Sequence, residues 1–577
     1  MIKLFKNLKP YWKNVVGVLT FTMIGVLCEL FLPRLMGNIV DKGVVNGDIN
    51  YILKTGIKMV VFAVIGTCSM IVSAYLSSKA ATGFGKDLRR MVFTKVEGFS
   101  LNEMEKIGTS SLITRTINDI NQMQQVAIMS MRMMVRAPLM LIGGFVMAFS
   151  TNSTLSRILL LSGPLLIIVI ALIGKIAFPF FKKIQEKIDN INKVMREELS
   201  GIRVIRAFNK VGFEKVRFEK ANRDLTETFL KVTRIMTLVM PLIMIILNFT
   251  NVAVIWFGSN LISTNDMEVG QLMAFIQYVM QIMFSLIMVS VIFIMFPRAS
   301  ASASRINEVL DLESEIVDGA EKLPENKEGD ILELKDVTFN YFDSVTPAIK
   351  DVSFKVKKGE TTAIIGGTGS GKSTILNLIM RFFDPVRGEI LLNGKNIKDI
   401  SQEELRKHFS LVPQKTVLFT GTIRDNIKMG KEDATDEEII EALKIAQAYD
   451  FVLKNKEGLD YIISQGGKNL SGGQKQRLSI ARAIVRRPDF YLFDDSFSAL
   501  DFKTDKILRE ELKKVTQNSG VLIVAQRIST IMDAETIVVL DDGVIVGVGN
   551  HKELLKTCEV YREIAQSQLG EEALKDE

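Results

Sequence analysis

Six long apolar runs in the first 300 residues restrict what this chain can fold into more than any other feature. The centres of these runs are uncharged, except in the first, which contains Glu29 and Arg34. A helix needs about 20 mostly apolar residues to cross the hydrocarbon core of a bilayer. The sequence therefore predicts an all-helical polytopic membrane domain in contact with the lipid bilayer. Its expected spans are residues 14–36, 59–78, 137–156, 158–178, 237–262 and 271–297.

The connections between these spans differ in length and charge. Those after the first, third and fifth spans are short and carry few cations, whereas those after the second and fourth are long and basic. Cytoplasmic loops of membrane proteins carry an excess of Lys and Arg. We therefore expect a multi-pass protein of the cytoplasmic membrane whose N-terminus, long loops and C-terminal part are cytoplasmic. The stretch EKIDNINKVMREELSGIRVIRAF has helical periodicity, which predicts that spans continue as helices beyond the membrane.

Glu29 is the clearest charged residue within a span, and such residues are often functional. The hydropathy pattern places Glu29 near the outer end of the first span, where its carboxylate could reach water. The sequence leaves two hypotheses open, namely a solvated carboxylate and a contact with a transported molecule.

The composition changes after about residue 330, where charged residues and glycines become frequent, as is typical of an α/β domain. The polar stretch at 317–330 is interpreted as a linker between a membrane domain at 1–316 and a second domain at 331–577. The three cysteines are far apart, which excludes a disulfide framework. The net charge is +7, and the basic residues cluster in the loops between the apolar runs. This distribution favours a membrane over nucleic acid as the partner.

The stretch AIIGGTGSGKST at 363–374 follows an apolar strand pattern and opens a helical one. It contains the spacing G-x-x-x-x-G-K-[ST], in which backbone N–H groups surround phosphate oxygens at a helix N-terminus. Lys372 is expected to reach the β- and γ-phosphates and Ser373 to ligate Mg²⁺. The expected nucleotide-binding residues are Gly366, Gly367, Thr368, Gly369, Ser370, Gly371, Lys372, Ser373 and Thr374.

A second apolar strand pattern, FYLFD at 490–494, ends in two adjacent carboxylates. The first, Asp494, is expected beside the Mg²⁺ of the P-loop site. The second, Asp495, is a candidate base for the attacking water. Upstream, Tyr341 is a candidate for stacking on adenine, although a packed core aromatic explains it equally well.

The stretch NLSGGQKQRLSIARAI at 469–484 places Ser471, Gly472 and Gly473 at the start of a helical pattern. These residues could form another cradle of backbone N–H groups for a γ-phosphate. By spacing alone they could also be an ordinary glycine-rich loop before a helix.

LSGGQ, together with the P-loop before it and the acid-terminated strand after it, resembles the ATP-binding-cassette superfamily. Six spans ahead of one such cassette resemble a half-transporter of the ABC exporter type. The resemblance extends along almost the whole chain, through RFFDP (381–385), LVPQ (411–414), LFTGTIRDNI (418–427) and SALD (498–501), and in the membrane part through GTSSLITRTINDI (108–120) and ELSGIRVIRAF (198–208).

The resemblance implies two cassettes that close face to face around two ATP molecules, each with Mg²⁺. Each site would join the P-loop of one cassette to the LSGGQ loop, here Leu470, Ser471, Gly472, Gly473 and Gln474, of the other. Gln414 matches the glutamine that touches Mg²⁺ and the coupling helices of the membrane domain. Tyr341 matches the adenine-stacking position, and Asp501 matches an aspartate that acts across the interface. Ser373, Gln414 and Asp494 are thus the implied metal-binding residues.

Two positions depart from the family pattern. The residue after the metal-binding Asp is normally Glu, but here it is Asp495, whose side chain is one methylene shorter. A displacement of about 1 Å can lower a rate about 10²-fold. The switch segment, VLIVAQRIST at 521–530, has Gln526 where the family has His, and Gln cannot become a cation. Gln465, before the LSGGQ loop, is a softer departure from a frequent Glu.

These departures predict one subunit of a heterodimeric ATP-driven exporter, which binds ATP at a slow, degenerate site and supplies an intact LSGGQ loop to a competent site. A homodimeric exporter and an ATP-gated channel or regulator are the alternatives. A soluble DNA-repair ATPase has a similar signature, but the six spans argue against it. The expected cargo is a small amphipathic or apolar molecule of unspecified identity, since Met-rich spans suit an adaptable cavity.

Overall fold

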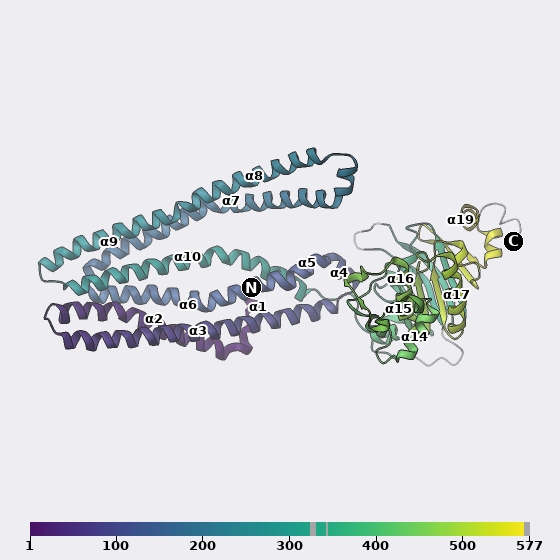
Figure 1. Ribbon diagram of the computed structural model, residues 1–577, viewed down its shortest axis with the longest axis horizontal. Coiled ribbons are helices and arrows are strands. Elements are labelled where there is room, and N and C mark those ends of the chain that lie inside the picture. Colours follow the sequence, from purple (N-terminus) through teal and green to yellow (C-terminus); the bar gives the residue numbers. More distant parts are fainter. Residues whose placement is uncertain (324–330, 342–343, 345, 570–577) are drawn as a thin grey trace. The chain divides into compact units, whose positions relative to one another are not determined.

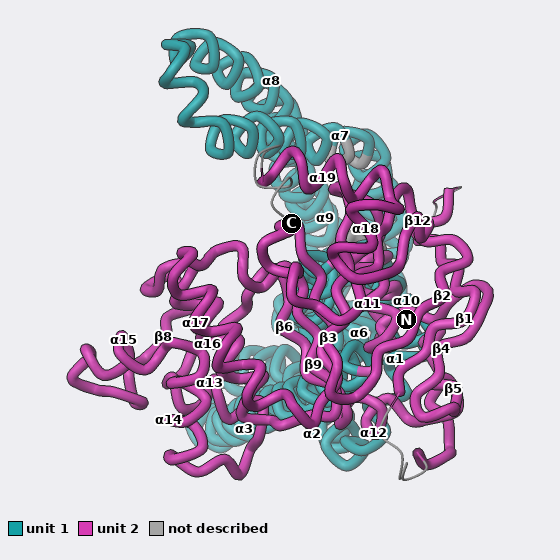
Figure 2. Tube along the Cα trace, turned by 90° about the vertical axis from the view of Figure 1, so that its right-hand side faces the viewer, with its two compact units in different colours: residues 1–97, 109–312 teal, residues 98–108, 313–577 magenta. Residues whose placement is uncertain are grey.

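The computed structural model describes residues 1–323, 331–341, 344 and 346–569. The chain forms two compact units, one of residues 1–97 and 109–312 and the other of residues 98–108 and 313–577 (Figure 2).

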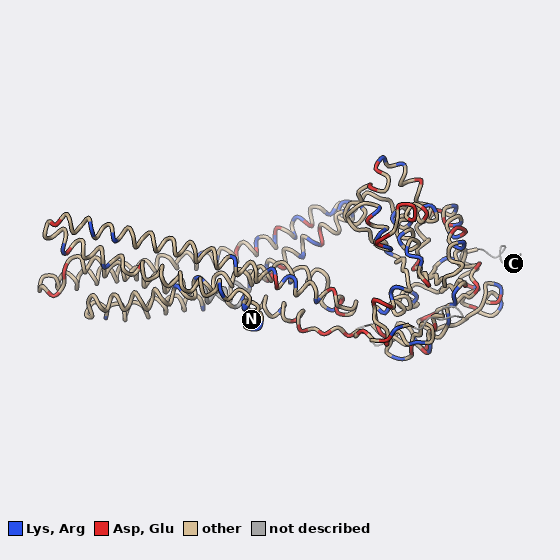
Figure 3. The backbone as a smooth tube through the Cα atoms, turned by 90° about the horizontal axis from the view of Figure 1, so that it is seen from below, with Lys and Arg blue, Asp and Glu red and all other residues tan. Residues whose placement is uncertain are grey.

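The first unit is entirely helical, as the sequence predicts (Figure 1). Six of its helical segments are long and apolar enough to cross a membrane. Figure 3 shows long stretches of these helices without Lys, Arg, Asp or Glu. The elements are α1 (Ile2–Phe5), the 3₁₀ helix η1 (Lys6–Tyr11), α2 (Trp12–Asn38), the π-helix η2 (Ile39–Val44), α3 (Ile49–Glu97), α5 (Thr109–Thr114), the π-helix η3 (Arg115–Asp119), α6 (Ile120–Thr151), α7 (Ser153–Ala207), α8 (Val211–Thr237), α9 (Val239–Ser263) and α10 (Val269–Asp311).

The predicted helical extensions beyond the spans are confirmed. Helix α3 has 49 residues and α7 has 55. At about 1.5 Å per residue, α7 is roughly 80 Å long, more than twice the thickness of a hydrocarbon core. Helices α7 and α8 run side by side along the outer part of these extensions (Figure 1).

The predicted boundary between the third and fourth spans, at Arg157, is wrong. Helix α6 ends at Thr151, and Asn152 has an extended backbone with φ of −156° and ψ of 116°. The Asn152 side chain accepts hydrogen bonds of 3.0 Å from the N–H groups of Thr154 and Leu155, which start α7. An N-cap therefore sets the turn inside a run that hydropathy alone assigned to the third span.

Small residues allow the helices of the first unit to approach closely. A Cβ at Gly37 of α2 would lie 2.7 Å from the carbonyl oxygen of Gly270 of α10. Thr22 of α2 and Ser73 of α3 are buried and share a 2.8 Å hydrogen bond between their hydroxyl groups. Close backbone approach and interhelical hydrogen bonds are typical of helix packing in membranes, where burial of apolar surface cannot drive association.

The second unit is an α/β domain with two main sheets. One has the strand order β2-β1-β4-β5, and the other has the order β12-β11-β3-β10-β9-β6. In the second sheet, β11, β3, β10, β9 and β6 are parallel, and β12 is antiparallel to β11. The strands are β1 (Ile331–Phe339), β2 (Ile349–Lys357), β3 (Thr361–Gly366), β4 (Arg387–Leu392), β5 (Lys395–Asn396), β6 (Phe409–Val412), β7 (Gly421–Thr422), β8 (Ile462–Ile463), β9 (Phe490–Asp494), β10 (Gly520–Val524), β11 (Thr536–Asp541) and β12 (Val544–Gly549).

Helices alternate with the strands of this unit. They are α11 (Lys372–Ile379), α12 (Gln402–Lys407), α13 (Ile423–Lys428), α14 (Asp436–Ile445), α15 (Tyr449–Lys454), α16 (Gly472–Arg486), α17 (Phe502–Val515), α18 (His551–Thr557) and α19 (Glu559–Leu569). The alternation of strands and helices produces the parallel order of this sheet, since parallel neighbours need a crossover connection.

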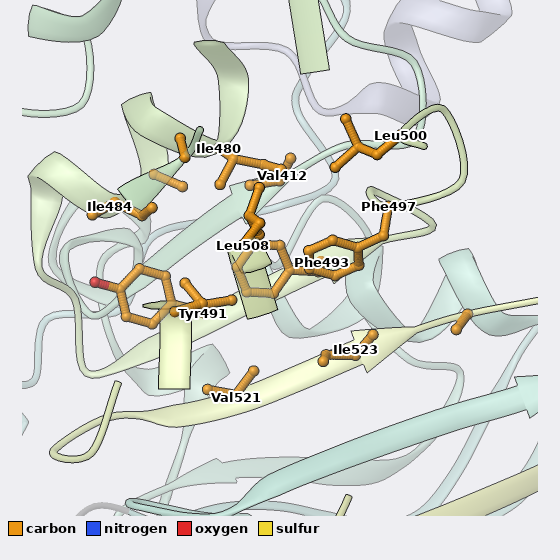
Figure 4. Close-up of a cluster of buried hydrophobic side chains, with 14 of the residues drawn as sticks. Val412, Ile480, Ile484, Tyr491, Phe493, Phe497, Leu500, Leu508, Val521 and Ile523 are labelled. Atoms are coloured by element: carbon orange, nitrogen blue, oxygen red, sulfur yellow. The ribbon is translucent and has the colours of Figure 1, made fainter. Parts of the chain in front are cut away.

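Strand β9 is buried on both faces, which fixes the position of its carboxyl end. Tyr491 and Phe493 point to the same face and pack with Ile484 of α16 in one core cluster (Figure 4). Phe493 also lies 5.3 Å, between ring centroids, from Phe497 beyond the strand end. Leu492 points to the opposite face and belongs to the other core cluster. The carboxylate that follows Phe493 therefore extends from a rigid strand.

The short segment 98–108, which the sequence assigns to the membrane domain at 1–316, groups with the second unit. Its helix α4 (Leu101–Ile107) begins with a capping box of Ser100 and Glu103. The buried carboxylate of Glu103 also accepts a 3.1 Å hydrogen bond from the N–H of Glu315. A second bond of 2.6 Å joins the Asn102 side chain to the Glu315 carboxylate. These bonds hold α4 against the segment that leads to β1, which the apolar pattern of the sequence does not reveal.

Candidate functional site

Most of the predicted nucleotide-binding residues lie at the carboxyl ends of four neighbouring parallel strands. The P-loop follows β3, Gln526 lies beyond β10, the pair Asp494 and Asp495 ends β9, and Gln414 lies beyond β6. In open α/β sheets, ligands bind at the carboxyl ends of the strands. The fold therefore brings together residues that are up to 160 positions apart in the chain.

The P-loop has a backbone shape that its glycines make possible. Gly369 and Gly371 have φ of 88° and 93°, a region that other residues rarely adopt. A Cβ at Gly366 would lie 2.1 Å from the carbonyl oxygen of Leu540, and one at Gly371 would lie 2.6 Å from that of Ala348. The loop is thus packed against β11 and the start of β2. Its shape requires glycine at positions 366 and 371, because a Cβ would clash with the neighbouring backbone.

Lys372 is buried and bends back over this loop. Its ammonium group donates to the carbonyl oxygens of Gly366 at 2.9 Å and Gly367 at 2.6 Å. Burial lowers the pKa of Lys372, and the carboxylates of Asp495 and Asp494 oppose that change. The ammonium group therefore stands beside the P-loop cradle, within reach of an anion bound there.

Two of the three residues expected to hold Mg²⁺, Ser373 and Asp494, contact each other directly. The Ser373 hydroxyl, in the first turn of α11, donates a 2.9 Å hydrogen bond to Oδ1 of Asp494. Burial raises the pKa of Asp494, as does the neighbouring Asp495, whereas the Ser373 hydrogen bond and Lys372 lower it. A divalent cation would relieve the cost of this buried charge.

Asp495 has a left-handed backbone conformation, with φ of 47°. Its N–H donates a 2.8 Å hydrogen bond to the carbonyl of Val524, which locks this bend to β10. Its carboxylate accepts a 3.4 Å hydrogen bond from the Gln414 amide. The structure thus places Asp495 and Gln414 side by side, with Asp495 in a strained conformation of the kind that clusters at functional sites.

Gln526, the switch position, has an exposed side chain and a fixed backbone. The N–H of Ala525, the residue before it, donates a 3.1 Å hydrogen bond to Ile364 of β3. The Gln526 carbonyl accepts a 2.7 Å hydrogen bond from the side chain of Gln568 in α19. Sequence reasoning missed Gln568, because this residue lies in no recognisable motif.

The LSGGQ loop and Asp501 form a separate group. Ser471 caps α16 through a capping box with Gln474, and both Ser471 and Gly472 are exposed. A Cβ at Gly473 would lie 3.2 Å from the carbonyl of Ala499, close to Asp501, which caps α17 through the N–H of Thr504. Among the described residues of this cassette, no hydrogen bond joins Leu470, Ser471, Gly472, Gly473 or Gln474 to the P-loop.

Tyr341 lies just after β1, where its ring packs edge-on against Phe339 at 5.0 Å and Phe383 at 5.4 Å between centroids. Its hydroxyl shares a 3.1 Å hydrogen bond with the Thr374 hydroxyl, next to the P-loop lysine and serine. The phenol is half-buried and tied to the start of α11. Its stacking on adenine stays a prediction.

The residues of the P-loop and of the end of β9 fit a nucleoside triphosphate with Mg²⁺. The P-loop forms a cradle that side chains would fill, Lys372 supplies a cation, and Ser373 and Asp494 supply two oxygens for a metal. Within the described residues, no group of three or more His, Cys, Asp and Glu could hold a metal without such a ligand.

Glu29 has an ion-pair partner on another helix. Its carboxylate forms a 2.8 Å ion pair with Arg136 of α6, and the two side chains are 37% and 33% exposed. Glu29 and Arg136 each lie about 22 Å along the axis from the helix ends at Val44 and Thr151. The ion pair is the new observation, and the place of Glu29 near the outer end of the span stays a prediction. The signal for the partner was an arginine directly before the third apolar run.

Comparison with known proteins agrees with this architecture. The family model described as ABC transporter transmembrane region matches residues 15–319, and the model described as ABC transporter matches residues 349–498. An ABC transporter ATP-binding protein of Mycobacterium tuberculosis is 38% identical over 98% of this chain and 97% of its own length. One of Bacillus subtilis is 37% identical over 99% of both chains.

Two further relatives extend the comparison. The ATP-dependent lipid A-core flippase of Vibrio parahaemolyticus is 30% identical over 99% of this chain and 98% of its own. The solved structure of a bacterial Atm1-family ABC exporter with ATP bound has the same fold, with a TM-score of 0.81 and 24% identity over 96% of this chain and 98% of that one. The chain therefore belongs to the ABC transporter family, as an exporter half-transporter in which a six-helix membrane region is fused to one ATP-binding cassette.

Proposed function

We propose that this ATP-driven exporter subunit works as one half of a heterodimer and contributes the slower of two ATP sites. The observation that carries the proposal is the short carboxylate of Asp495 at the end of β9, bonded to Gln414. At the switch position, Gln526 can donate and accept hydrogen bonds but cannot carry a positive charge. Both substitutions weaken the polarisation of an attacking water while leaving the groups for binding ATP complete.

In the proposed site each residue has a distinct task. Lys372 and the P-loop N–H groups bind the phosphates, and Ser373 and Asp494 would hold Mg²⁺, which neutralises charge on the phosphates. Asp495 would accept the proton of the water, and its shortness costs about 10²-fold in rate. ATP held here favours the closed, outward-facing state more than it supplies turnover.

The LSGGQ loop is proposed to complete the competent site of the partner. Ser471 is exposed, and a Cβ at Gly472 would meet no heavy atom within 4 Å. Helix α16, which has 15 residues, begins at this exposed loop. The dipole of the helix favours binding of an anion at its N-terminus. Hydrolysis at that site would then reset the transporter to its inward-facing state.

The proposed location is the cytoplasmic membrane, with the N-terminus and the cassette in the cytoplasm. The basic residues of the long connections support this orientation. The proposed cargo is a small amphipathic or apolar molecule. An apolar cavity of about 740 Å³ between α1 and α6, lined by residues such as Ile2, Met131 and Met134, supports an apolar ligand. The ion pair of Glu29 and Arg136 supports a polar group on that ligand.

Two single substitutions test the assignment of the sites. Ser471→Ala removes a hydroxyl from the proposed competent site, whereas Lys372→Ala removes the ammonium group of the proposed slow site. We expect steady-state ATPase of the purified complex to fall about 10²-fold or more with Ser471→Ala and less than about threefold with Lys372→Ala. Equal losses would contradict the asymmetry and favour the homodimer, which a pulldown with a tagged copy would identify.

The channel alternative makes a different prediction. A channel passes ionic current with ATP bound and without turnover. A current through planar bilayers that contain a hydrolysis-deficient complex would therefore contradict the exporter proposal and support the channel. We expect no such current, because alternating access never opens both sides of the membrane at once.

A further inference from the structure

The backbone of the switch segment is held from outside every recognised ATP-binding motif. A single side chain amide, that of Gln568 in α19, makes two hydrogen bonds to it. Its nitrogen donates 2.7 Å to the carbonyl of Gln526, and its oxygen accepts 2.8 Å from the N–H of Ile528. The two bonded residues, Gln526 and Ile528, flank Arg527. The amide of Gln568 therefore bridges the backbone on both sides of Arg527.

A second side chain holds the end of the same segment. Arg509 of α17 donates to the carbonyls of Ser529 at 3.1 Å and Thr530 at 3.4 Å, while its other nitrogens bond to Asp505. On the opposite side, the N–H of Ala525 bonds to β3, directly before the P-loop. The backbone at Gln526 is thus fixed between the strand that carries the P-loop and the amide of Gln568.

We infer that Gln568 is a positioning residue for ATP hydrolysis, which sets the direction of the Gln526 side chain toward the γ-phosphate. The inference rests on the proposed role of Gln526 at the switch position. It deepens that role, because Gln568 bonds to the carbonyl of the residue whose side chain is proposed to contact the phosphate. A role in stability alone would need no bond to that carbonyl, since the bond to Ile528 already anchors α19.

The inference makes α19 part of the ATP-sensing device of the cassette. When a bound γ-phosphate restrains the Gln526 side chain, the two hydrogen bonds of Gln568 also restrain the last turn of α19. Energetic coupling between two sites is reciprocal, so a molecule that binds α19 more tightly when ATP is bound must also raise the affinity for ATP.

Three variants of the full-length transporter, reconstituted with its partner in lipid nanodiscs, test this inference. Gln568→Ala removes both bonds. Gln568→Glu keeps an oxygen for the Ile528 N–H but places a carboxylate against the Gln526 carbonyl. Gln566→Ala is the matched control, because Gln566 is an exposed glutamine of the same helix and is two residues away. The measurements are kcat and KM for ATP at this site, with the partner's catalytic Glu replaced, and amide exchange of residues 526–530.

We expect Gln568→Ala and Gln568→Glu to lower kcat about tenfold with KM changed less than twofold, since a misplaced side chain costs rate more than binding. Exchange at Ile528 should rise about fivefold in Gln568→Ala and stay near the wild-type value in Gln568→Glu, because a neutral hydrogen bond contributes a factor of that size. Gln566→Ala should change neither quantity. This split between rate and exchange separates positioning from mere anchoring.

A Gln568→Glu transporter with wild-type kcat would overturn the inference, since anchoring through Ile528 would then be sufficient. Unchanged kcat in Gln568→Ala would overturn it as well. These outcomes are ratios to the wild-type rate at the same site. They therefore remain readable if the site proves fast, which would contradict the proposed slow site but not the role of Gln568. Calorimetric unfolding of each variant shows whether a loss of rate reflects a loss of fold.

Discussion

The hydroxyl of Ser373 and the carboxylate of Asp494 lie 2.9 Å apart and share a hydrogen bond, although 121 residues separate them. Both groups are oxygens that Mg²⁺ accepts as ligands, and each belongs to a rigid element, α11 and β9. If both groups bind Mg²⁺, as proposed, metal binding would replace their mutual hydrogen bond with bonds to the cation.

This relationship predicts a pH dependence of Mg²⁺ and ATP binding. Burial raises the pKa of Asp494 above its ordinary value, so its carboxylate begins to take up a proton at a higher pH than an ordinary Asp. The affinity for Mg²⁺ with ATP should therefore weaken earlier as the pH falls, and Asp494→Asn should flatten this dependence. Titration of magnesium-dependent ATP binding between pH 4 and about 8 measures both curves.

The same raised pKa acts on stability in the opposite sense. Without nucleotide, an acid whose pKa is higher in the folded state stabilises the fold below the pKa of the unfolded state. That contribution is lost as the pH rises through the folded pKa. Nucleotide-free protein should thus gain from Asp494→Asn near neutral pH, seen as a higher calorimetric unfolding temperature. A lower unfolding temperature for this variant would show that the charge of Asp494 is compensated.

The glycines of the P-loop predict a graded cost of added side chains. Gly369→Ala places a Cβ in open space but strains a backbone with φ of 88°, whereas Gly371→Ala adds a Cβ 2.6 Å from the Ala348 carbonyl. The strain costs about 1–2 kcal/mol in both variants. The clash should make Gly371→Ala the more destabilising of the two. Calorimetry of the nucleotide-free protein checks the order, and equal unfolding temperatures would show that β2 moves to accommodate the Cβ.

The short carboxylate predicts that the slow site can be restored. Asp495→Glu lengthens the base and Gln526→His supplies a side chain that can become charged. With the partner's catalytic Glu replaced, the double variant should turn over about 10²-fold faster than the parent, within the range of a general base. Asp495→Glu alone should recover only part. The measurement is phosphate release by the complex, and an unchanged rate in the double variant would assign the slowness to the LSGGQ loop of the partner.

The ion pair between α2 and α6 predicts a charge-swap rescue. Glu29→Arg or Arg136→Glu alone leaves like charges within the membrane part and should lower the unfolding temperature and the transport-coupled ATPase. The exchanged double variant restores opposite charges, so its stability should recover. If Glu29 contributes to cargo binding, stimulation of the ATPase by cargo should stay low in the double variant. Full recovery of both quantities would leave the pair with a structural role alone.

Much of this architecture follows from patterns that the sequence carries openly. The apolar runs predict the six helices because length and absence of charge decide insertion. The P-loop motif predicts the loop after β3 because Gly369 and Gly371 adopt positive φ values that other residues rarely adopt. The break at Asn152 could not be predicted from hydropathy, since one N-cap outweighs an apolar average. The motifs predict that Asp494 and Ser373 hold one metal ion, and in the structure these two side chains share a hydrogen bond. Gln568 lies in no motif, and only the fold of the chain brings it to Gln526.

The great length of α7 has a mechanical consequence. Pro179 lies inside this helix and has no N–H to bond to the carbonyl of Lys175, so the helix is easier to bend at this point. The arm from Pro179 to Ala207 is about 42 Å long, so a bend of about 5° at the proline moves its far end by about 4 Å. The residues before Pro179 need not tilt at all during such a bend. Helix α7 would in this way act as a lever hinged at Pro179, near one end of the apolar stretch. The far end of its outer part could be displaced before the membrane part has to tilt.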